Sequence, residues 1–336
     1  MLSASRVTTI QPARAIEGGR IAIHGSGFET DQPQLPDVRI GNQPARVVFA
    51  SPTRLSVIVP AGIADKGRTA VRIGGVADEA AFIDIAGPLA TGLHQVDNPV
   101  FDQSGNLYVT YSGTRGQQVP VSIFRVRPNG TRETFSSGIV NPTSMAIDPS
   151  GRLYVSSRFE GTVYRLNDDG SVEAFATDLG VACGLVFGRD GSLFVGDRTG
   201  TIFKVQRDGT ASPFATLPAS VAAFHLAVAA DDTLFVSVPT LAPYDTVYRI
   251  DQAGHVSAVT TRFGRPQGIA LDHGGTLHVV EALAGESGLY RVPPHGEPEL
   301  VLAGAGLVGV AFDPHGGLVV CSNETAYRLA AAPSAA

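Results

Sequence analysis

A leucine followed by further hydrophobic residues recurs six times in the C-terminal part of this 336-residue chain. Successive copies lie 40 to 46 residues apart, and each is followed by an aromatic residue next to a basic one, such as Tyr164-Arg165. Self-similarity at a fixed period of this length indicates a repeat architecture, in which each copy is one structural unit. The repeat leucines are Leu107, Leu153, Leu193, Leu234, Leu277 and Leu318.

Each copy contains four short segments with the alternating pattern of β-strands. In the second copy they lie at residues 145–147, 153–156, 163–166 and 172–176, separated by turn sequences rich in Asp, Asn, Pro and Gly. Helical solenoids of similar period require a spacing of 3.6 residues between apolar positions, which is not seen here. Four strands per repeat are typical of a propeller blade. We therefore predict a six-bladed β-propeller.

The last copy is one strand short, because the chain leaves no room for a fourth strand after Leu329. An unpaired edge strand exposes backbone groups and invites aggregation. We therefore expect residues 87–93 to supply the missing strand, so that the propeller spans residues 87–329. Residues 330–336 are then a disordered tail.

The segment before the propeller also has the pattern of a β protein. Between residues 7 and 86, runs of four to six residues alternate between apolar and polar side chains and are separated by Gly and Pro. Such runs favour a half-buried β-sandwich. The sequence thus predicts an all-β protein made of an N-terminal β-sandwich and a propeller.

Composition excludes several classes of function. The net charge is −6, and neither sign forms the block of charge that marks a nucleic-acid site. No apolar run approaches the roughly 20 residues of a membrane span, so we expect no membrane insertion. The two cysteines, Cys183 and Cys321, cannot form a disulfide scaffold. The N-terminus lacks the apolar core of a signal peptide, which leaves a cytoplasmic protein or an exported one with its signal removed.

Two family resemblances follow from particular motifs. The N-terminal segment resembles the TIG/IPT family of immunoglobulin-like modules, through Ile10-x-Pro12, Gly18-Gly19, Ile23-x-Gly25-x-Gly27-Phe28, Val38-x-Ile40-Gly41, Ala45 and Val57-x-Val59-Pro60. The repeats resemble NHL repeats and the SMP-30/gluconolactonase group, through Asn98-Pro99-x-x-Asp102, Pro142 with Ile147-Asp148-Pro149-x-Gly151, and Pro266-x-Gly268-Ile269-Ala270-Leu271-Asp272. The first resemblance implies a docking module. The second implies a propeller, a scaffold that hosts many unrelated functions.

Comparison among the six copies separates scaffold from candidate site. Aspartates that recur five residues before the repeat leucine, at Asp102, Asp148, Asp272 and Asp313, are interpreted as turn caps. Polar residues that differ between copies, near the start of the first strand and the end of the second, are expected to face one mouth of the central channel. Such concave, convergent places are where ligands bind. These residues are Asp97, Asn98, Arg158, Asp197, Arg198, His225, Gln267, Glu281 and Asn323.

The candidate catalytic residues in this set are His225 and Asp97. His225 occupies a position that three other copies give to glycine, and an imidazole can act as acid or base near neutral pH. The alternative for His225 is a rim histidine bonded to a backbone carbonyl, and the alternative for Asp197 and Glu281 is a structural role. The other residues of the set are candidate ligand-binding residues. The alternative for Arg158 and Arg198 is a solvated side chain or one paired with acids.

The gluconolactonase resemblance implies a divalent cation, such as Ca²⁺, held by a Glu, an Asn and an Asp in the channel mouth. By register these positions fall on Asp97, Cys183 and Gln267, and the substrate-contacting Asn-Asp pair falls on Thr143-Ser144. One charged oxygen ligand therefore remains, whereas Ca²⁺ takes six to eight oxygens. The identity of any metal is left open. A relocated site built from Asp97, Asp197, Glu281 and Asn323 is an alternative.

Three functional hypotheses follow. The first is a recognition protein that binds a small polar molecule, a peptide or a glycan at the channel mouth, with the N-terminal module for docking. The second is a lactonase-like hydrolase or a lyase, in which His225 is the general base and an ion or arginine stabilises the oxyanion. The third is a structural protein in which both modules are spacers.

Overall fold

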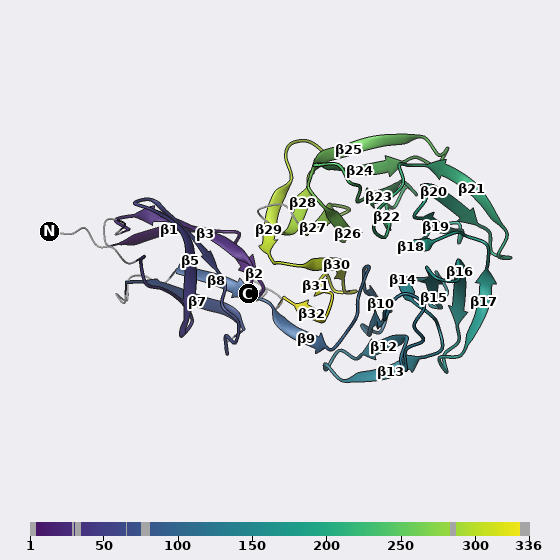
Figure 1. The fold of residues 1–336 in the computed structure, drawn as a ribbon, viewed down its shortest axis with the longest axis horizontal. Helices are drawn as coiled ribbons and strands as arrows, with labels where there is room; N and C mark the ends of the chain where they lie inside the picture. The colour runs from purple at the N-terminus through teal and green to yellow at the C-terminus, as the bar shows by residue number, and fades with distance from the viewer. Residues whose placement is uncertain are drawn as a thin grey trace.

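A computed structural model of the chain describes residues 5–28, 30, 35–64, 66–74, 81–282 and 287–329. Within these ranges the secondary structure consists of β-strands joined by turns, and there is no helix long and apolar enough to cross a membrane. Figure 1 shows two parts: a small group of strands at the N-terminal end and a larger ring of sheets arranged around a central axis. The expected disordered tail, residues 330–336, lies outside the described residues.

Among the described residues, the N-terminal part contains eight strands around one apolar core. Side chains of β1, β3 and β6, such as Ile23 and Leu55, pack against side chains of β4, β7 and β8, such as Ile40 and Ile83. Alternation of apolar and polar residues puts one face of each strand into this core and leaves the other outside. The strands are β1 (Arg6–Gln11), β2 (Arg14–Ala15), β3 (Arg20–Ser26), β4 (Val38–Ile40), β5 (Gln43–Ser51), β6 (Arg54–Ile58), β7 (Gly67–Ile73) and β8 (Ala81–Ile85).

The ring contains five separate four-stranded antiparallel sheets, each with its strands in radial order. Four of them follow the chain order of a single repeat. They are β10 (Val100–Phe101), β11 (Leu107–Thr110), β12 (Ile123–Val126) and β13 (Arg132–Ser136); β14 (Pro142–Ile147), β15 (Leu153–Ser157), β16 (Thr162–Leu166) and β17 (Val172–Ala176); β18 (Ala182–Phe187), β19 (Leu193–Asp197), β20 (Thr201–Val205) and β21 (Ala211–Thr216); and β22 (His225–Val228), β23 (Leu234–Val238), β24 (Asp245–Ile250) and β25 (Val256–Phe263).

The fifth separate sheet joins the two ends of the ring. It contains β30 (Leu307–Phe312), β31 (Leu318–Ser322), β32 (Thr325–Arg328) and β9 (Gly87–Thr91). Strand β9 pairs antiparallel with β32, with Ala90 opposite Ala326. A strand from before the first repeat therefore occupies the outer edge of the last sheet, within the segment 87–93 that the sequence analysis proposed for it.

The fifth repeat differs from the expectation of six separate blades. Its strands, β26 (Pro266–Leu271), β27 (Leu277–Glu281), β28 (Gly288–Val292) and β29 (Glu299–Ala303), have the same antiparallel order, but they belong to a twelve-stranded sheet that includes the N-terminal strands. The connection is β2, which pairs parallel with β8 on one side and with β29 at Ala303 on the other. The outer edge of β29 is thus partly covered by the N-terminal part, which removes unpaired backbone groups there.

A close approach of two backbones makes this connection. The amide of Ile16 donates to the carbonyl of Ala303 at 2.9 Å. A Cβ atom at residue 19 would lie 2.4 Å from the same carbonyl oxygen, so only glycine fits at Gly19. The two parts of the chain are therefore joined by main-chain contacts as well as by the linker between β8 and β9.

The recurring aspartates are turn caps, as the sequence analysis expected. Asp148 accepts hydrogen bonds from the amides of Ser150 and Arg152, at 2.8 and 2.9 Å. Asp272 and Asp313 accept equivalent pairs of amide hydrogen bonds in their own turns. These carboxylates satisfy backbone donors of the tight turns between the first and second strands. They belong to the scaffold of each repeat.

Candidate functional site

The innermost strands of the ring surround a central channel. They lie in the order β10, β14, β18, β22, β26 and β30, so that β10 and β22 are on opposite sides (Figure 1). One part of the channel is a cavity of 390 Å³ lined mainly by apolar side chains of all six strands, with Asp97, Asn98 and Ser144 at its polar end. Equivalent positions of the repeat line it, including Phe101, Ile147, Phe187, Val228, Leu271 and Phe312.

A hydrogen bond between His225 and Asp97 crosses the channel. His225 begins β22 and Asp97 precedes β10, and the imidazole Nδ1 donates to the carboxylate of Asp97. The side chain of His225 is fully buried and that of Asp97 is 2% exposed. The Asp97 carboxylate also accepts a hydrogen bond from the amide of Asn98 at 2.7 Å. The second ring nitrogen of His225 is buried and has no hydrogen-bond partner among the described residues.

Asn98 extends this closure to two further strands. Its side-chain nitrogen donates to the carbonyl of Ile269 on β26 at 2.8 Å, and its oxygen accepts from the amide of Val310 on β30 at 3.0 Å. Gly268 and Gly309 leave the space for this side chain, because a Cβ at residue 268 would lie 2.3 Å from Asn98 Oδ1. We refer to Asp97, Asn98 and His225 as the channel plug. Asp97 and Asn98 line the apolar cavity at the end where the innermost strands begin, which faces the other mouth of the channel.

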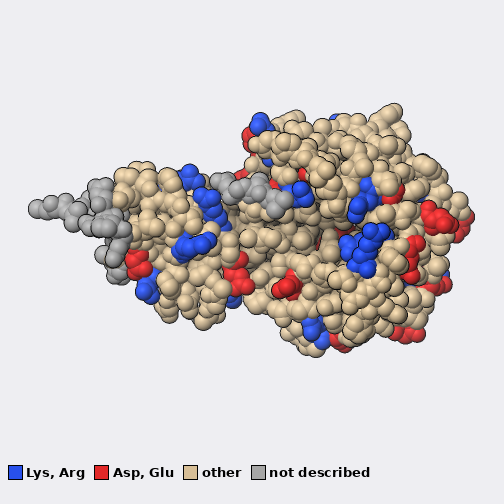
Figure 2. Space-filling view, viewed as in Figure 1, with Lys and Arg blue, Asp and Glu red and all other residues tan. Residues whose placement is uncertain are grey.

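Three arginines lie at that other mouth. Pairing of Ala182 with Asp197 puts the end of the second strand beside the start of the first, so Arg158 and Arg198, which follow β15 and β19, reach the same end of the ring. Arg115 joins them from the loop after β11. Figure 2 shows basic side chains gathered over the middle of the ring. We refer to Arg115, Arg158 and Arg198 as the arginine mouth.

The electrostatics of this mouth are unbalanced. Burial lowers the pKa of the half-buried Arg158, and the positive charges of Arg198 and Arg115 lower it further. Within the described ranges none of the three arginines forms an ion pair with an acid. Repulsion among them is a cost that an anionic ligand would relieve.

His94 adds a second unsatisfied group at the same place. Burial and the charge of Arg158 lower its pKa, although Glu324 acts in the opposite direction. Its Nδ1 atom is buried without a hydrogen-bond partner in the part of the chain that the structure describes. Sequence reasoning did not identify His94 or Arg115, because neither lies at a compared repeat position. The packing of the first repeat against the second brings them to Arg158.

Two of the acidic residues predicted for the site, Glu281 and Asp197, accept hydrogen bonds from loop amides. Both carboxylate oxygens of Glu281 accept amide hydrogen bonds from Gly264 and Arg265, between 2.6 and 3.1 Å. Asp197 accepts from the amide of Val181 at 2.8 Å and from the hydroxyl of Thr199. Both side chains are buried, which agrees with the structural alternative for them. A role for either in ligand binding stays a prediction.

The remaining predicted residues lie at the same end of the ring but differ in how much of the side chain is free. Asn323 donates to the carbonyl of Gln95 at 2.9 Å and so ties the last repeat to the first. Gln267 contributes its main-chain carbonyl, which accepts from the hydroxyl of Ser237 at 2.6 Å. Its side chain is half-buried.

The positions to which the resemblance assigned a cation, Asp97, Cys183 and Gln267, do not suit one here. Asp97 is engaged by His225 and Asn98. Burial, with a smaller effect of Asp97, raises the pKa of the Cys183 thiol to about 12, so it stays protonated and offers no hard anionic ligand. Among the described residues, no group of three or more His, Cys, Asp or Glu is arranged to hold a metal ion, including the relocated set suggested by the sequence.

Comparison with known proteins identifies the N-terminal part and the fold. Residues 5–83 match the family model of the IPT/TIG domain. No curated protein matches the chain. Among solved structures, an auxiliary nutrient binding protein from Bacteroides ovatus is 14% identical with a TM-score of 0.54, and the match covers 98% of each chain.

Two enzymes share the same architecture. A gluconolactonase from Xanthomonas campestris is 16% identical with a TM-score of 0.61, over 89% of this chain and 99% of that chain. A catalytically inactive virginiamycin B lyase from Staphylococcus aureus, solved with quinupristin, is 14% identical with a TM-score of 0.52, over 97% of this chain and 96% of that chain. At these identities the likeness is one of fold. The chain is an all-β protein with a TIG domain followed by a propeller-like ring of sheets.

Proposed function

We propose that this protein is a recognition protein that binds a small anionic molecule at the arginine mouth. The proposal treats residues 87–329 as a six-bladed propeller, with β26–β29 counted as a blade, and residues 7–86 as an immunoglobulin-like docking module. One observation carries it: Arg115, Arg158 and Arg198 lie together without acidic partners in the described structure. Guanidinium groups bind carboxylates and phosphates in a bidentate manner, so a carboxylate or phosphate group is the chemistry they fit.

The plug strengthens the argument for binding rather than catalysis. A ligand seated above it meets His94 and the arginines, whereas His225 is fully buried below the surface of the mouth. Recognition of carboxylated sugars or of an acidic peptide or glycan terminus falls within this chemistry. That solved propellers of this fold include auxiliary nutrient binding proteins is consistent with the proposal.

The experiment is a thermal-shift panel of small ligands. We expect sugar acids, dicarboxylates or phosphorylated sugars to raise the melting temperature, whereas the matched neutral sugars leave it unchanged. A ligand at a hundred times its Kd stabilises the native state by about 2.7 kcal/mol. The shift should be lost in Arg158→Ala and retained in Arg165→Ala, whose arginine pairs with Glu173 away from the mouth. A shift that is equal in both variants would place the ligand elsewhere.

A second candidate function, a lactonase-like hydrolase or a lyase, is favoured by the contact between His225 and Asp97. A carboxylate that orients an imidazole is the arrangement of a general base, and gluconolactonases share the fold. In this mechanism the plug must open so that the free ring nitrogen of His225 reaches a bound lactone or activates a water. A panel of lactones and esters tests it. Turnover that disappears in Asp97→Asn, at a temperature where that variant is folded, would favour the enzyme over the recognition protein.

A further inference from the structure

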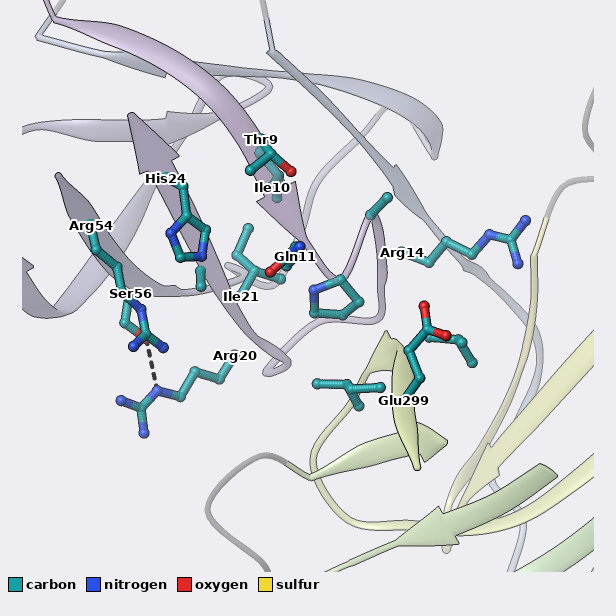
Figure 3. Close-up of a pocket in the computed structure, with 15 residues that line it drawn as sticks. Thr9, Ile10, Gln11, Arg14, Arg20, Ile21, His24, Arg54, Ser56 and Glu299 are labelled. Carbon is teal, nitrogen blue, oxygen red and sulfur yellow. Dashed lines mark hydrogen bonds between the residues drawn. The ribbon is translucent and has the colours of Figure 1, made fainter. Parts of the chain in front are cut away.

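A cavity of 800 Å³ lies between the TIG domain and the fifth repeat. One wall is formed by β1, β2, β3 and β6, and the other by residues Glu299–Val301 of β29 (Figure 3). This cavity is remote from the channel, and the inference drawn from it is independent of the proposed function. We refer to it as the interdomain groove.

The floor of the groove is the outer face of the TIG sheet. The register pairs Thr9 with His24 and Gln11 with Ala22 across β1 and β3, and Ala22 with Ser56 across β3 and β6. Paired residues point to the same side, so small and hydrogen-bonding side chains form a flat polar surface. An outward sheet face of this kind is ordinarily solvated. Here the propeller stands over it and converts it into a groove.

Positive charge is concentrated in this groove. Arg14, Arg20 and Arg54 line it, are exposed, and form no ion pair with a described acid. Arg20 donates to the hydroxyl of Ser56 at 2.8 Å. The one acid of the lining, Glu299, already pairs with Arg291. Figure 3 shows Arg20 and Arg54 at one side of the pocket and Arg14 at the other, beside Glu299.

The groove also contains an open strand edge. Strand β29 pairs with β28 along its length, but on its other side it pairs with β2 only at Ala303. Strand β2 is two residues long, and Pro12 and Ala13, which precede it and line the cavity, are not paired with β29. Residues 299–301 therefore present an edge to the groove in the place that a longer neighbouring strand would occupy. An extended peptide can complete such an edge by main-chain hydrogen bonds.

We propose that the interdomain groove binds an extended acidic peptide segment of a partner protein. The peptide adds as a short strand beside β29, and its carboxylates contact Arg14 at one end and Arg20 and Arg54 at the other. Main-chain hydrogen bonds to β29 require an extended peptide backbone, which a polyanion such as a polysaccharide lacks. The arginines select acidic side chains on that peptide. The TIG domain and the propeller then hold the partner jointly.

Fluorescence anisotropy with a short labelled peptide of alternating glutamate and valine tests the proposal on the full chain. We expect the glutamate peptide to bind, and the same peptide with glutamine to bind at least about tenfold more weakly. The double variant Arg20→Glu/Arg54→Glu should lose binding. Arg72→Glu, on β7 outside the groove, reverses one charge on the same domain, where the double variant reverses two, and should bind within about twofold of the unaltered protein. If the double variant does not fold, Arg54→Gln serves in its place.

Two further probes separate a peptide strand from a general anion site. A glutamate peptide N-methylated at alternate residues keeps its charge but cannot pair with β29, so it should bind at least about tenfold more weakly. A heparin oligosaccharide should compete poorly. Equal binding of the methylated peptide, or a heparin fragment that competes as well as the peptide, would overturn the proposal in favour of a simple polyanion surface. No binding of the glutamate peptide to the unaltered protein would also overturn it.

Discussion

Removal of the imidazole in His225→Ala tests the role of the channel plug. The variant leaves the Asp97 carboxylate, 2% exposed, with the amide of Asn98 as its remaining donor from the plug. Loss of the hydrogen-bond donor to a buried carboxylate costs about 3 kcal/mol, because the remaining charge is desolvated and uncompensated. For a domain of about 240 residues, 3 kcal/mol corresponds to a fall in melting temperature of roughly 6 to 12 °C.

The assay is urea unfolding of His225→Ala, Asp97→Ala and the double variant. Because each single change strands the other group, we expect the double variant to be less destabilised than the sum of the singles, with a coupling energy of about 1–3 kcal/mol. The pair formed by His255 and Asp251 has the same chemistry but is 82% and 54% exposed. His255→Ala should therefore change the free energy of unfolding by less than about 0.5 kcal/mol.

Additive effects in this cycle would refute the reasoning. So would a His225→Ala variant that unfolds at the same urea concentration as His255→Ala. Either result would mean that the plug contributes no more than an exposed pair and that the channel is not held closed by it.

Three other predictions concern the scaffold. Asn141 has φ of 46°, and its side chain forms hydrogen bonds with main-chain groups of Ser112, Thr114 and Gly116. Asn141→Ala should therefore lower the free energy of unfolding by about 2–4 kcal/mol in urea titrations. An effect below about 1 kcal/mol would contradict this structural role. Burial acts to raise the pKa of Asp148, but hydrogen bonds from Ser150 and Arg152 lower it overall. The contribution of this carboxylate to stability is complete above the ordinary carboxyl pKa of about 3.9 and is lost as the pH falls through the lower native pKa. Asp148→Asn should therefore lose less stability in acid than the unaltered protein, and identical pH profiles of the two would refute the assignment. Burial raises the pKa of Cys183 to about 12 and also raises that of Cys321. Neither thiol should therefore react with a disulfide reagent at pH 8 until urea unfolds the chain. Rapid labelling of the native protein would show that the channel opens.

The repeat pattern predicted the all-β propeller because its strands form within one repeat. Pairing of Leu107 with Phe101, and of Leu153 with Ile147, joins residues six apart in sequence, so the signal is local and recurs in every copy. The same is true of the turn caps, whose carboxylates bond amides two and four residues away. The TIG domain was equally readable from its motifs and matches that family model.

The pairing between the TIG domain and the fifth repeat could not be predicted from the sequence. It depends on Ala15 meeting Ala303, and β2 carries no alternating pattern because it is only two residues long. For the same reason the sequence predicted a separate fifth blade, whereas that sheet continues into the TIG domain. The interdomain groove exists only because of this junction.

The candidate site divides in the same way. Comparison among copies found His225, Asp97 and Arg158 as residues that the scaffold does not explain, and this step needed the sequence alone. Which of them are accessible was decided by ring closure, which brings His225 across the channel to an aspartate 128 positions away. Packing within and between neighbouring repeats left Glu281 bonded to the amides of Gly264 and Arg265, and Arg158 beside unpaired arginines. Strand pairing within a repeat is determined by residues close together in the sequence. The burial and charge balance of the site residues depend on which distant repeats the closed ring places face to face.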